Sequence, residues 1–122
     1  MIVPPKKPRA EGGIRSCIRM RIPPASQNEA IEILGSIAAR IQADTRCLST
    51  GIYRCLDDAS VIMLEEFWQC PEGILQHLRS DDYRRILLVL EMAEEAPDIR
   101  FDTIAHSSGI EVIKKARIAD ES

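Results

Sequence analysis

The side chains best suited to move a proton in this chain are His77 and Glu66. A histidine exchanges protons near neutral pH, so His77 is a candidate general base. Glu66 lies near the end of an apolar segment, where a carboxylate without a cation is a candidate acid or base. Structural roles are the alternative. His77 would then bond a backbone group or Glu66 from the flank of a helix, and Glu66 would pair with an arginine.

Three aromatic residues are candidates for binding a substrate. Trp68 follows Glu66 by two residues and has the flat surface needed to stack on an aromatic ring. The hydroxyls of Tyr53 and Tyr83 can form hydrogen bonds with a substrate oxygen. The alternatives are a core tryptophan at the end of a strand and tyrosine hydroxyls that point to solvent.

Arginines near the N-terminus are candidates for holding an anionic group. Arg19 is the candidate for substrate binding, with Arg21 on the same face of the predicted strand. Such arginines more often pair with acids, and Glu65 or Asp102 on a neighbouring strand would serve here. His106, near the end of the last predicted strand, is expected at the surface.

Hydrophobic alternation predicts four strands that position these residues. They cover residues 14–22, 47–56, 61–68 and 98–105. Alternation along the third strand places Glu66 and Trp68 on the same face. Gly51 within the second strand indicates a bulge or a close backbone approach. The short connection at residues 57–59 makes the second and third strands an antiparallel hairpin.

Helical periodicity predicts three helices between these strands. Ser26 begins the first helix with a capping box that Glu29 completes, and this helix ends near Ala43. After the third strand, Pro71 suits the first turn of a short helix, because that position needs no N–H partner. Ser80 and the two aspartates after it begin a longer helix, since acids complement its positive N-terminal end.

This order of elements, β-α-β-β-α-β with the second helix split in two, is the ferredoxin-like plan of an α+β domain. Such a sheet has helices on only one face. The predicted strands carry apolar residues on both faces, so we expect the open face to be covered too. A second copy of the chain would cover it, which predicts a homodimer.

The length of 122 residues suits one domain with its own core. We assign residues 14–106 to this domain and expect residues 1–13, with three prolines and two glycines, to be a flexible lead. Residues 107–122 form a C-terminal extension. We favour a short helix there over an extension of the last strand that swaps onto a partner.

The composition argues against several classes of partner. A net charge of −3 and a pI near 5.4 do not suit a nucleic-acid binder, which is usually basic. An aromatic content of 4% leaves few side chains for stacking on bases. There is no apolar run of membrane length and no signal-peptide core. We therefore expect no membrane partner and a cytoplasmic location.

The cysteine pattern predicts free thiols and no metal site. The four cysteines form no C-x-x-C pair, and no histidine stands at metal-ligand spacing from them. They are Cys17, Cys47, Cys55 and Cys70. A zinc site would need closely paired ligands.

The central run of residues resembles the antibiotic biosynthesis monooxygenase family of small, cofactor-free, quinol-monooxygenase-like proteins. The matching residues are Glu66-Phe67-Trp68 at a strand end, His77 on the next helix, Ser80 and Tyr83. Weaker matches are Cys47-Leu48-Ser49 with Tyr53, and Ala96-Pro97-Asp98-Ile99 before the last strand. The resemblance covers about residues 14–106. It implies a ferredoxin-like protomer and a dimeric α+β barrel, in which the two sheets close on each other.

The resemblance also implies an activity, namely oxidation of a small quinol or phenolic aromatic by molecular oxygen without metal or flavin. His77 and Glu66 would handle protons, while the pocket residues would be Trp68, Tyr53, Tyr83 and Arg19. Haem-degrading relatives use an Asn on the first strand and a His on the last helix, and this chain has neither, so haem is not expected. Thr45-Arg46-Cys47 replaces the family's frequent Pro-Gly, so this turn is expected to differ. The alternative function is a non-catalytic dimer of the same fold that binds a small molecule or a partner.

Overall fold

The computed structural model describes residues 12–121, and its centre is an antiparallel sheet. The four strands in this part of the chain are β1 (Ile14–Arg21), β2 (Cys47–Arg54), β3 (Val61–Trp68) and β4 (Asp98–Thr103). Their order across the sheet is β2-β3-β1-β4. This topology, with β3 and β1 as the two central strands, confirms the predicted ferredoxin-like α+β fold.

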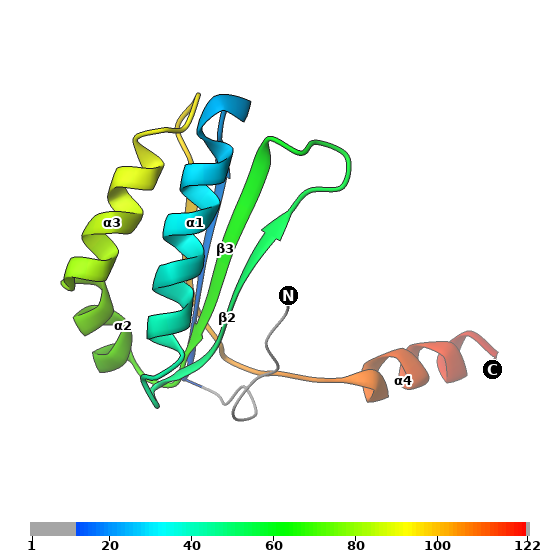
Figure 1. The fold of residues 1–122 in the computed structure, drawn as a ribbon. Helices are drawn as coiled ribbons and strands as arrows, with labels where there is room; N and C mark the ends of the chain where they lie inside the picture. The colour runs from blue at the N-terminus through cyan, green and yellow to red at the C-terminus, as the bar shows by residue number, and fades with distance from the viewer. Residues whose placement is uncertain (1–11, 122) are drawn as a thin grey trace.

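Three helices cover one face of the sheet, and the other face is open (Figure 1). The covering helices are α1 (Pro24–Ile41), α2 (Pro71–Leu78) and α3 (Asp81–Leu90). A fourth helix, α4 (Ile110–Glu121), projects away from this body after β4. Of the two conformations considered for the C-terminal extension, a helix and an extended strand, the structure shows the helix. The flexible lead predicted for residues 1–13 falls mostly on residues outside the described range.

Strand β3 connects the sheet to the helical core. Its bounds are those predicted, and its alternation confirms that Glu66 and Trp68 face the helices together with Ile62 and Leu64. The side chains at these four positions are at most 2% exposed. The helices close over them with the buried residues Leu34, Ile37, Ile41, Ile74, Ile86 and Val89.

The capping box predicted at Ser26 is wrong, because α1 begins earlier. Pro23 is the N-cap residue in extended conformation, and Pro24 occupies the first turn, where its fixed φ suits a helix. Ser26 is therefore already inside the helix. Gln27 anchors this end instead, since its Nε2 donates to the carbonyl oxygens of Ile22 and Ala59 over 3.1 Å each.

Strand β2 is shorter than predicted and contains a bulge. It ends at Arg54 instead of residue 56, and its register with β3 shifts by one residue between Cys47 and Ser49. Gly51 is regularly paired with Glu65, so the bulge does not lie at this glycine. The side chain of Tyr53 lies over Gly51, where an added Cβ would be 2.7 Å from the tyrosine hydroxyl. The close approach at Gly51 is thus made by a side chain.

The junction of α2 and α3 follows the sequence prediction. Pro71 occupies the first turn of α2, and Ser80 caps α3 by accepting a 3.1 Å hydrogen bond from the backbone N–H of Tyr83. The Ser80 hydroxyl also donates to the backbone carbonyl of His77 over 2.6 Å. One serine therefore fixes His77 and Tyr83 relative to each other.

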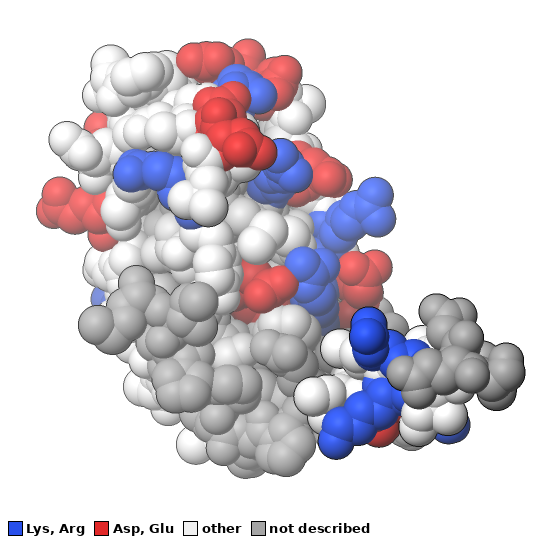
Figure 2. Space-filling view, turned by 90° about the vertical axis from the view of Figure 1, so that its right-hand side faces the viewer, with Lys and Arg blue, Asp and Glu red and all other residues white. Residues whose placement is uncertain are grey.

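The open face of the sheet carries interspersed positive and negative side chains (Figure 2). Arg15 pairs with Glu65 at 2.7 Å and lies 3.8 Å from Asp102. Glu65 and Asp102, which were predicted to pair with Arg19 or Arg21, thus pair with Arg15. Both acids share a face of the sheet with Arg15, because Asp102 lies opposite Arg15 on β4 and Glu65 lies two residues from the β3 residue opposite Arg15. Arg21 pairs instead with Asp58 and Glu95, outside the sheet.

Among the described helices, none has the length and apolar character of a membrane span.

Candidate functional site

Four of the residues selected from the sequence meet between the sheet and the helices. Glu66 and Trp68 come from β3, His77 from α2 and Tyr83 from the first turn of α3. The strand period places the first two on the helix-covered face, and the short α2 carries His77 back over them. We call these residues the Glu66–His77 cluster.

Glu66 is the centre of the Glu66–His77 cluster. It is 1% exposed, and the Trp68 Nε1–H donates to its Oε1 over 3.0 Å. The His77 Nε2 lies 3.2 Å from Oε1 and 3.3 Å from Oε2. Burial of a carboxylate is costly unless donors surround it, and these two N–H groups fill that role. The partner of Glu66 is therefore a histidine, as one structural alternative for His77 predicted, and not an arginine.

Two ring contacts fix the orientation of His77. Its ring stacks on Trp68 with centroids 5.0 Å apart and an interplanar angle of 26°. Tyr83 meets the other side edge-on, at 5.2 Å and 89°. Burial raises the pKa of the Tyr83 phenol, and the nearby Glu66 carboxylate raises it further. Tyr83 therefore remains a neutral phenol well into alkaline solution.

A pocket of about 250 Å³ reaches the Glu66–His77 cluster from the surface. Trp68 and His77 form its apolar and aromatic wall, and Ser80 lies at the α2–α3 junction. Charged side chains surround its mouth. They form two ion pairs, Arg46–Asp44 at 2.9 Å and Arg40–Asp82 at 3.3 Å. A small planar molecule in this pocket would contact both rings.

The charged residues at the mouth of this pocket were not selected from the sequence. Arg40 comes from the end of α1, Arg46 from the α1–β2 turn and Asp82 from α3. No local motif marks them, because only the packing of three separate segments brings them together. The one relevant signal was the unusual turn at Arg46, whose guanidinium also donates to the side chain of Gln76 over 2.8 Å.

The structure separates the other two selected residues from the Glu66–His77 cluster. Tyr53 and Arg19 lie on the open face of the sheet, on either side of Met63. They line a hollow of about 150 Å³ together with Val61. Arg19 is exposed, and no hydrogen bond or ion pair engages it among the described residues. These residues can meet a ligand only on the side of the sheet away from His77.

Within residues 12–121, no group of three or more His, Cys, Asp or Glu side chains is placed to hold a metal ion. The four cysteines, all within the described residues, form no disulfide with one another, and Cys47 is buried in the core. His106 is exposed and lies 2.9 Å from the Ser108 hydroxyl. The candidate chemistry of the described chain therefore concentrates in the Glu66–His77 cluster.

Comparison with protein families gives one clear match. The sequence model of the family described as antibiotic biosynthesis monooxygenase matches residues 14–87, which is more than half of the chain. The match includes β1, α1, β2, β3, α2 and most of α3, and thus every residue of the Glu66–His77 cluster. No curated protein matched the sequence.

Solved structures share the fold at low sequence identity. A conserved protein from Methanosarcina mazei Go1 is 22% identical, with a TM-score of 0.70, over 75% of this chain and 92% of the other. A protein from Caulobacter crescentus CB15, provisionally named as an antibiotic biosynthesis monooxygenase, is 18% identical, with a TM-score of 0.70, over 79% and 92%. One from Deinococcus radiodurans with the same provisional name is 14% identical, with a TM-score of 0.72, over 80% and 97%. At these identities the likeness concerns the fold.

Proposed function

The chain belongs to the antibiotic biosynthesis monooxygenase family, and from this premise we propose that it oxidises a small quinol or phenolic aromatic with molecular oxygen. The observation that carries the proposal is the contact between the buried Glu66 carboxylate and the His77 imidazole at the wall of a pocket. A base oriented by a carboxylate is what deprotonation of a phenol requires.

The proton step uses the two nitrogens of His77 differently. Its Nε2–H donates to Glu66, which fixes the tautomer and leaves the lone pair on Nδ1. Among the described residues, no hydrogen bond engages Nδ1. This nitrogen takes the proton from the substrate hydroxyl. Glu66 then stabilises the imidazolium that forms, because the two opposite charges lie in a region of low dielectric constant.

The oxidation step uses electrons from the substrate itself. A quinol that reacts with one molecule of oxygen gives a hydroxyquinone and one molecule of water. One oxygen atom enters the ring and the other leaves as water, so the four electrons that reduce oxygen all come from the organic molecule. Deprotonation makes the ring electron-rich enough to start this transfer, and the protein contributes by positioning the ring and shielding it from water.

The pocket residues suit a flat phenol. Trp68 offers its ring as a stacking surface beside His77, and the neutral Tyr83 hydroxyl lies in the same cluster. A volume of about 250 Å³ suits a single ring with small substituents better than a large polycyclic molecule. Tyr53 and Arg19 lie on the other face of the sheet. They could contact a substrate only if it bound between the two sheets of a dimeric barrel.

The proposed working form is a homodimer in which two open sheet faces meet. On strand β4, Ile99 and Phe101 are 42% and 46% exposed; they lie opposite Ile18 and Ser16 of β1, so their side chains are on the helix side of this sheet edge and not on the open face. Helix α4, which extends from the body, also exposes apolar residues (Figure 1). A second protomer would bury these surfaces. The lack of a disulfide among the four cysteines, all of which lie in the described part of the chain, supports a cytoplasmic location for this dimer.

Oxygen consumption with a panel of substituted hydroquinones tests the proposal. We expect the wild-type protein to accelerate uptake above the uncatalysed rate for at least one quinol and His77→Ala to lose this acceleration. The matched control is His106→Ala, which removes the exposed histidine and should keep the wild-type rate. Equal rates in all three proteins, or no acceleration by the wild type, would refute the proposed activity.

A second candidate function is a non-catalytic dimer that binds a small molecule. The observation that favours it is burial, since Glu66, Trp68 and His77 are 1%, 1% and 7% exposed and so also behave as a polar part of the core. On this account the Glu66–His77 cluster stabilises the fold. His77→Ala would then lower the stability without changing oxygen uptake from that of the wild type.

A further inference from the structure

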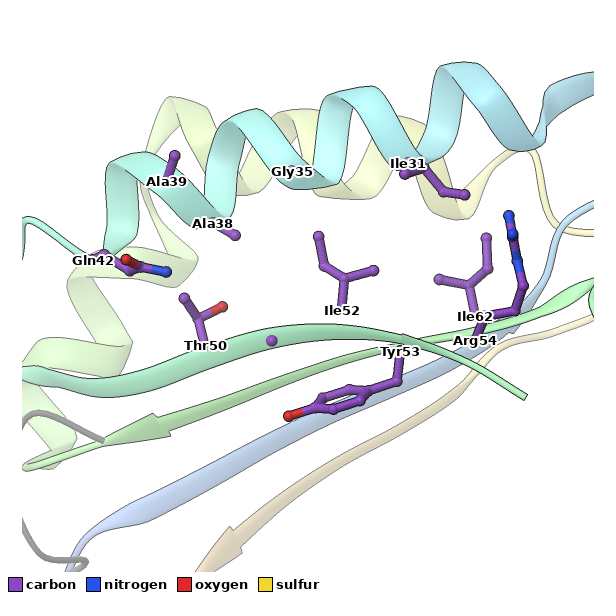
Figure 3. A pocket seen from close by; sticks show the side chains of 11 residues that line it. Ile31, Gly35, Ala38, Ala39, Gln42, Thr50, Ile52, Tyr53, Arg54 and Ile62 are labelled. Atoms are coloured by element: carbon purple, nitrogen blue, oxygen red, sulfur yellow. The ribbon is translucent and has the colours of Figure 1, made fainter. Parts of the chain in front are cut away.

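A groove between α1 and the edge strand β2 is separate from the pocket at His77. Its volume is about 480 Å³, within the range of small-molecule sites. Helix α1 forms one wall and β2 the other, as Figure 3 shows. We call it the α1–β2 groove, and its lining consists of Ile31, Gly35, Ala38, Ala39, Gln42, Thr50, Gly51, Ile52, Tyr53, Arg54 and Ile62.

The helix wall of the α1–β2 groove is kept open by small residues. Gly35 and Ala38 lie on the side of α1 that faces β2, and Ala39 also lines the groove (Figure 3). A Cβ added at Gly35 would meet no atom within 4 Å, so an alanine would fit there without a clash. Glycine inside a helix costs about 0.5–1 kcal/mol relative to alanine. Packing within the protomer therefore does not explain why position 35 lacks a side chain.

The strand wall provides an unsatisfied polar atom. Thr50 is 3% exposed, and its hydroxyl oxygen has no hydrogen-bond partner among the described residues. The side chain points from β2 toward α1, at the same end of the groove as Gln42 (Figure 3). A buried hydroxyl without a partner costs roughly 1–3 kcal/mol, and such groups are uncommon in folded proteins. A ligand oxygen beside Thr50 would remove this cost.

We propose that the α1–β2 groove binds a small aromatic alcohol, with its ring between Ile52 and Gly35 and its hydroxyl against Thr50. The isoleucines at positions 31, 52 and 62 supply an apolar surface for the ring. The threonine hydroxyl can donate or accept, and therefore pairs with a ligand O–H in either direction. Tyr53 takes no part through its side chain, which points to the other face of the sheet (Figure 3).

The test compares 2-naphthol with naphthalene, which has the same rings and no hydroxyl. Backbone amide signals of the whole protein, recorded by ¹H–¹⁵N NMR during titration, locate any site by residue. We expect saturable shifts at Gly35, Thr50 and Ile52 with 2-naphthol. One neutral hydrogen bond contributes about 0.5–1.5 kcal/mol, so naphthalene should bind roughly two- to tenfold more weakly.

Three variants make the test specific to the groove. Thr50→Val removes the hydroxyl at constant shape and should reduce 2-naphthol affinity two- to tenfold while raising the thermal midpoint of the free protein. Gly35→Leu should fill the groove and abolish the shifts, and Gly35→Ala is its matched control, which should keep binding. The proposal is overturned if 2-naphthol gives no saturable shift, if the shifts centre on His77, or if Thr50→Val binds as tightly as the wild type. Because NMR detects binding without turnover, these outcomes do not depend on the oxidation proposed above.

Discussion

Replacing Glu66 by glutamine tests the proposed proton pathway with almost no change of shape. Glu66 accepts from the Trp68 indole at Oε1 over 3.0 Å, and its Oε2 lies 3.3 Å from the His77 Nε2. A glutamine keeps one acceptor oxygen for Trp68 and presents an NH₂ donor to His77. The imidazole must then accept at Nε2, which moves its proton to Nδ1. The lone pair needed to deprotonate a substrate would be lost.

Stability and activity should respond very differently to Glu66→Gln. The glutamine side chain keeps a hydrogen bond with both Trp68 and His77, so the free energy of unfolding should change by no more than about 1–2 kcal/mol. General base catalysis contributes roughly 10²- to 10⁴-fold, and the rate of oxygen uptake should fall by that order. His77→Ala instead leaves the Glu66 carboxylate buried without one of its donors, which should destabilise the protein by about 3 kcal/mol.

The assay combines oxygen uptake, urea unfolding and ¹⁵N NMR of the histidine side chains. We expect the proton on Nε2 of His77 in the wild type and on Nδ1 in Glu66→Gln, with both proteins folded. A wild-type rate in Glu66→Gln together with the shifted proton would refute His77 as the base. His106→Ala serves again as the control, since that exposed histidine contacts Ser108 and not the Glu66–His77 cluster.

Three further predictions concern the fold and the dimer. Hydrogen bonds from Ser60 and Arg21 lower the pKa of Asp58 from 3.8 to about 2. Its charged form therefore stabilises the fold above pH 3.8, and this stabilisation is lost as the pH falls through 2. The urea midpoint of Asp58→Asn should accordingly lie below that of the wild type at pH 7 and converge with it near pH 2. Ser80→Ala should lower the free energy of unfolding by about 1 kcal/mol, because it removes the cap of α3. Ile113 on α4 is 58% exposed, so Ile113→Lys should leave the thermal midpoint of the protomer unchanged. If α4 packs against the partner in the dimer, this substitution should also reduce the molecular mass measured by light scattering. An unchanged dimer mass would exclude this role for α4.

The parts of the fold that sequence predicted well are those encoded by local signals. The bounds of β3 follow from a mostly apolar run, and the start of α3 follows from Ser80 and the acids after it. Local signals failed where two of them competed. Ser26 begins a good capping box, but the Pro23-Pro24 pair precedes it and starts α1 earlier, because proline suits the first turn. Rules that consider only neighbouring residues do not say whether the capping box or the proline pair determines where the helix begins.

The separation of Tyr53 from the Glu66–His77 cluster depends on a single extra residue in β2. Cys47 pairs with Trp68 in the core, and uninterrupted alternation from Cys47 would place Tyr53 on the same helix-covered face. The bulge between Cys47 and Ser49 shifts the register by one, and such a shift moves every later side chain of the strand to the opposite face. Tyr53 therefore leaves the side of His77, and Thr50 takes a place facing α1. No glycine or proline marks this bulge in the sequence, so only the strand pairing reveals it. A variant that deletes Leu48 would restore the simple alternation; it should bring Tyr53 toward the helices and abolish the groove at Thr50.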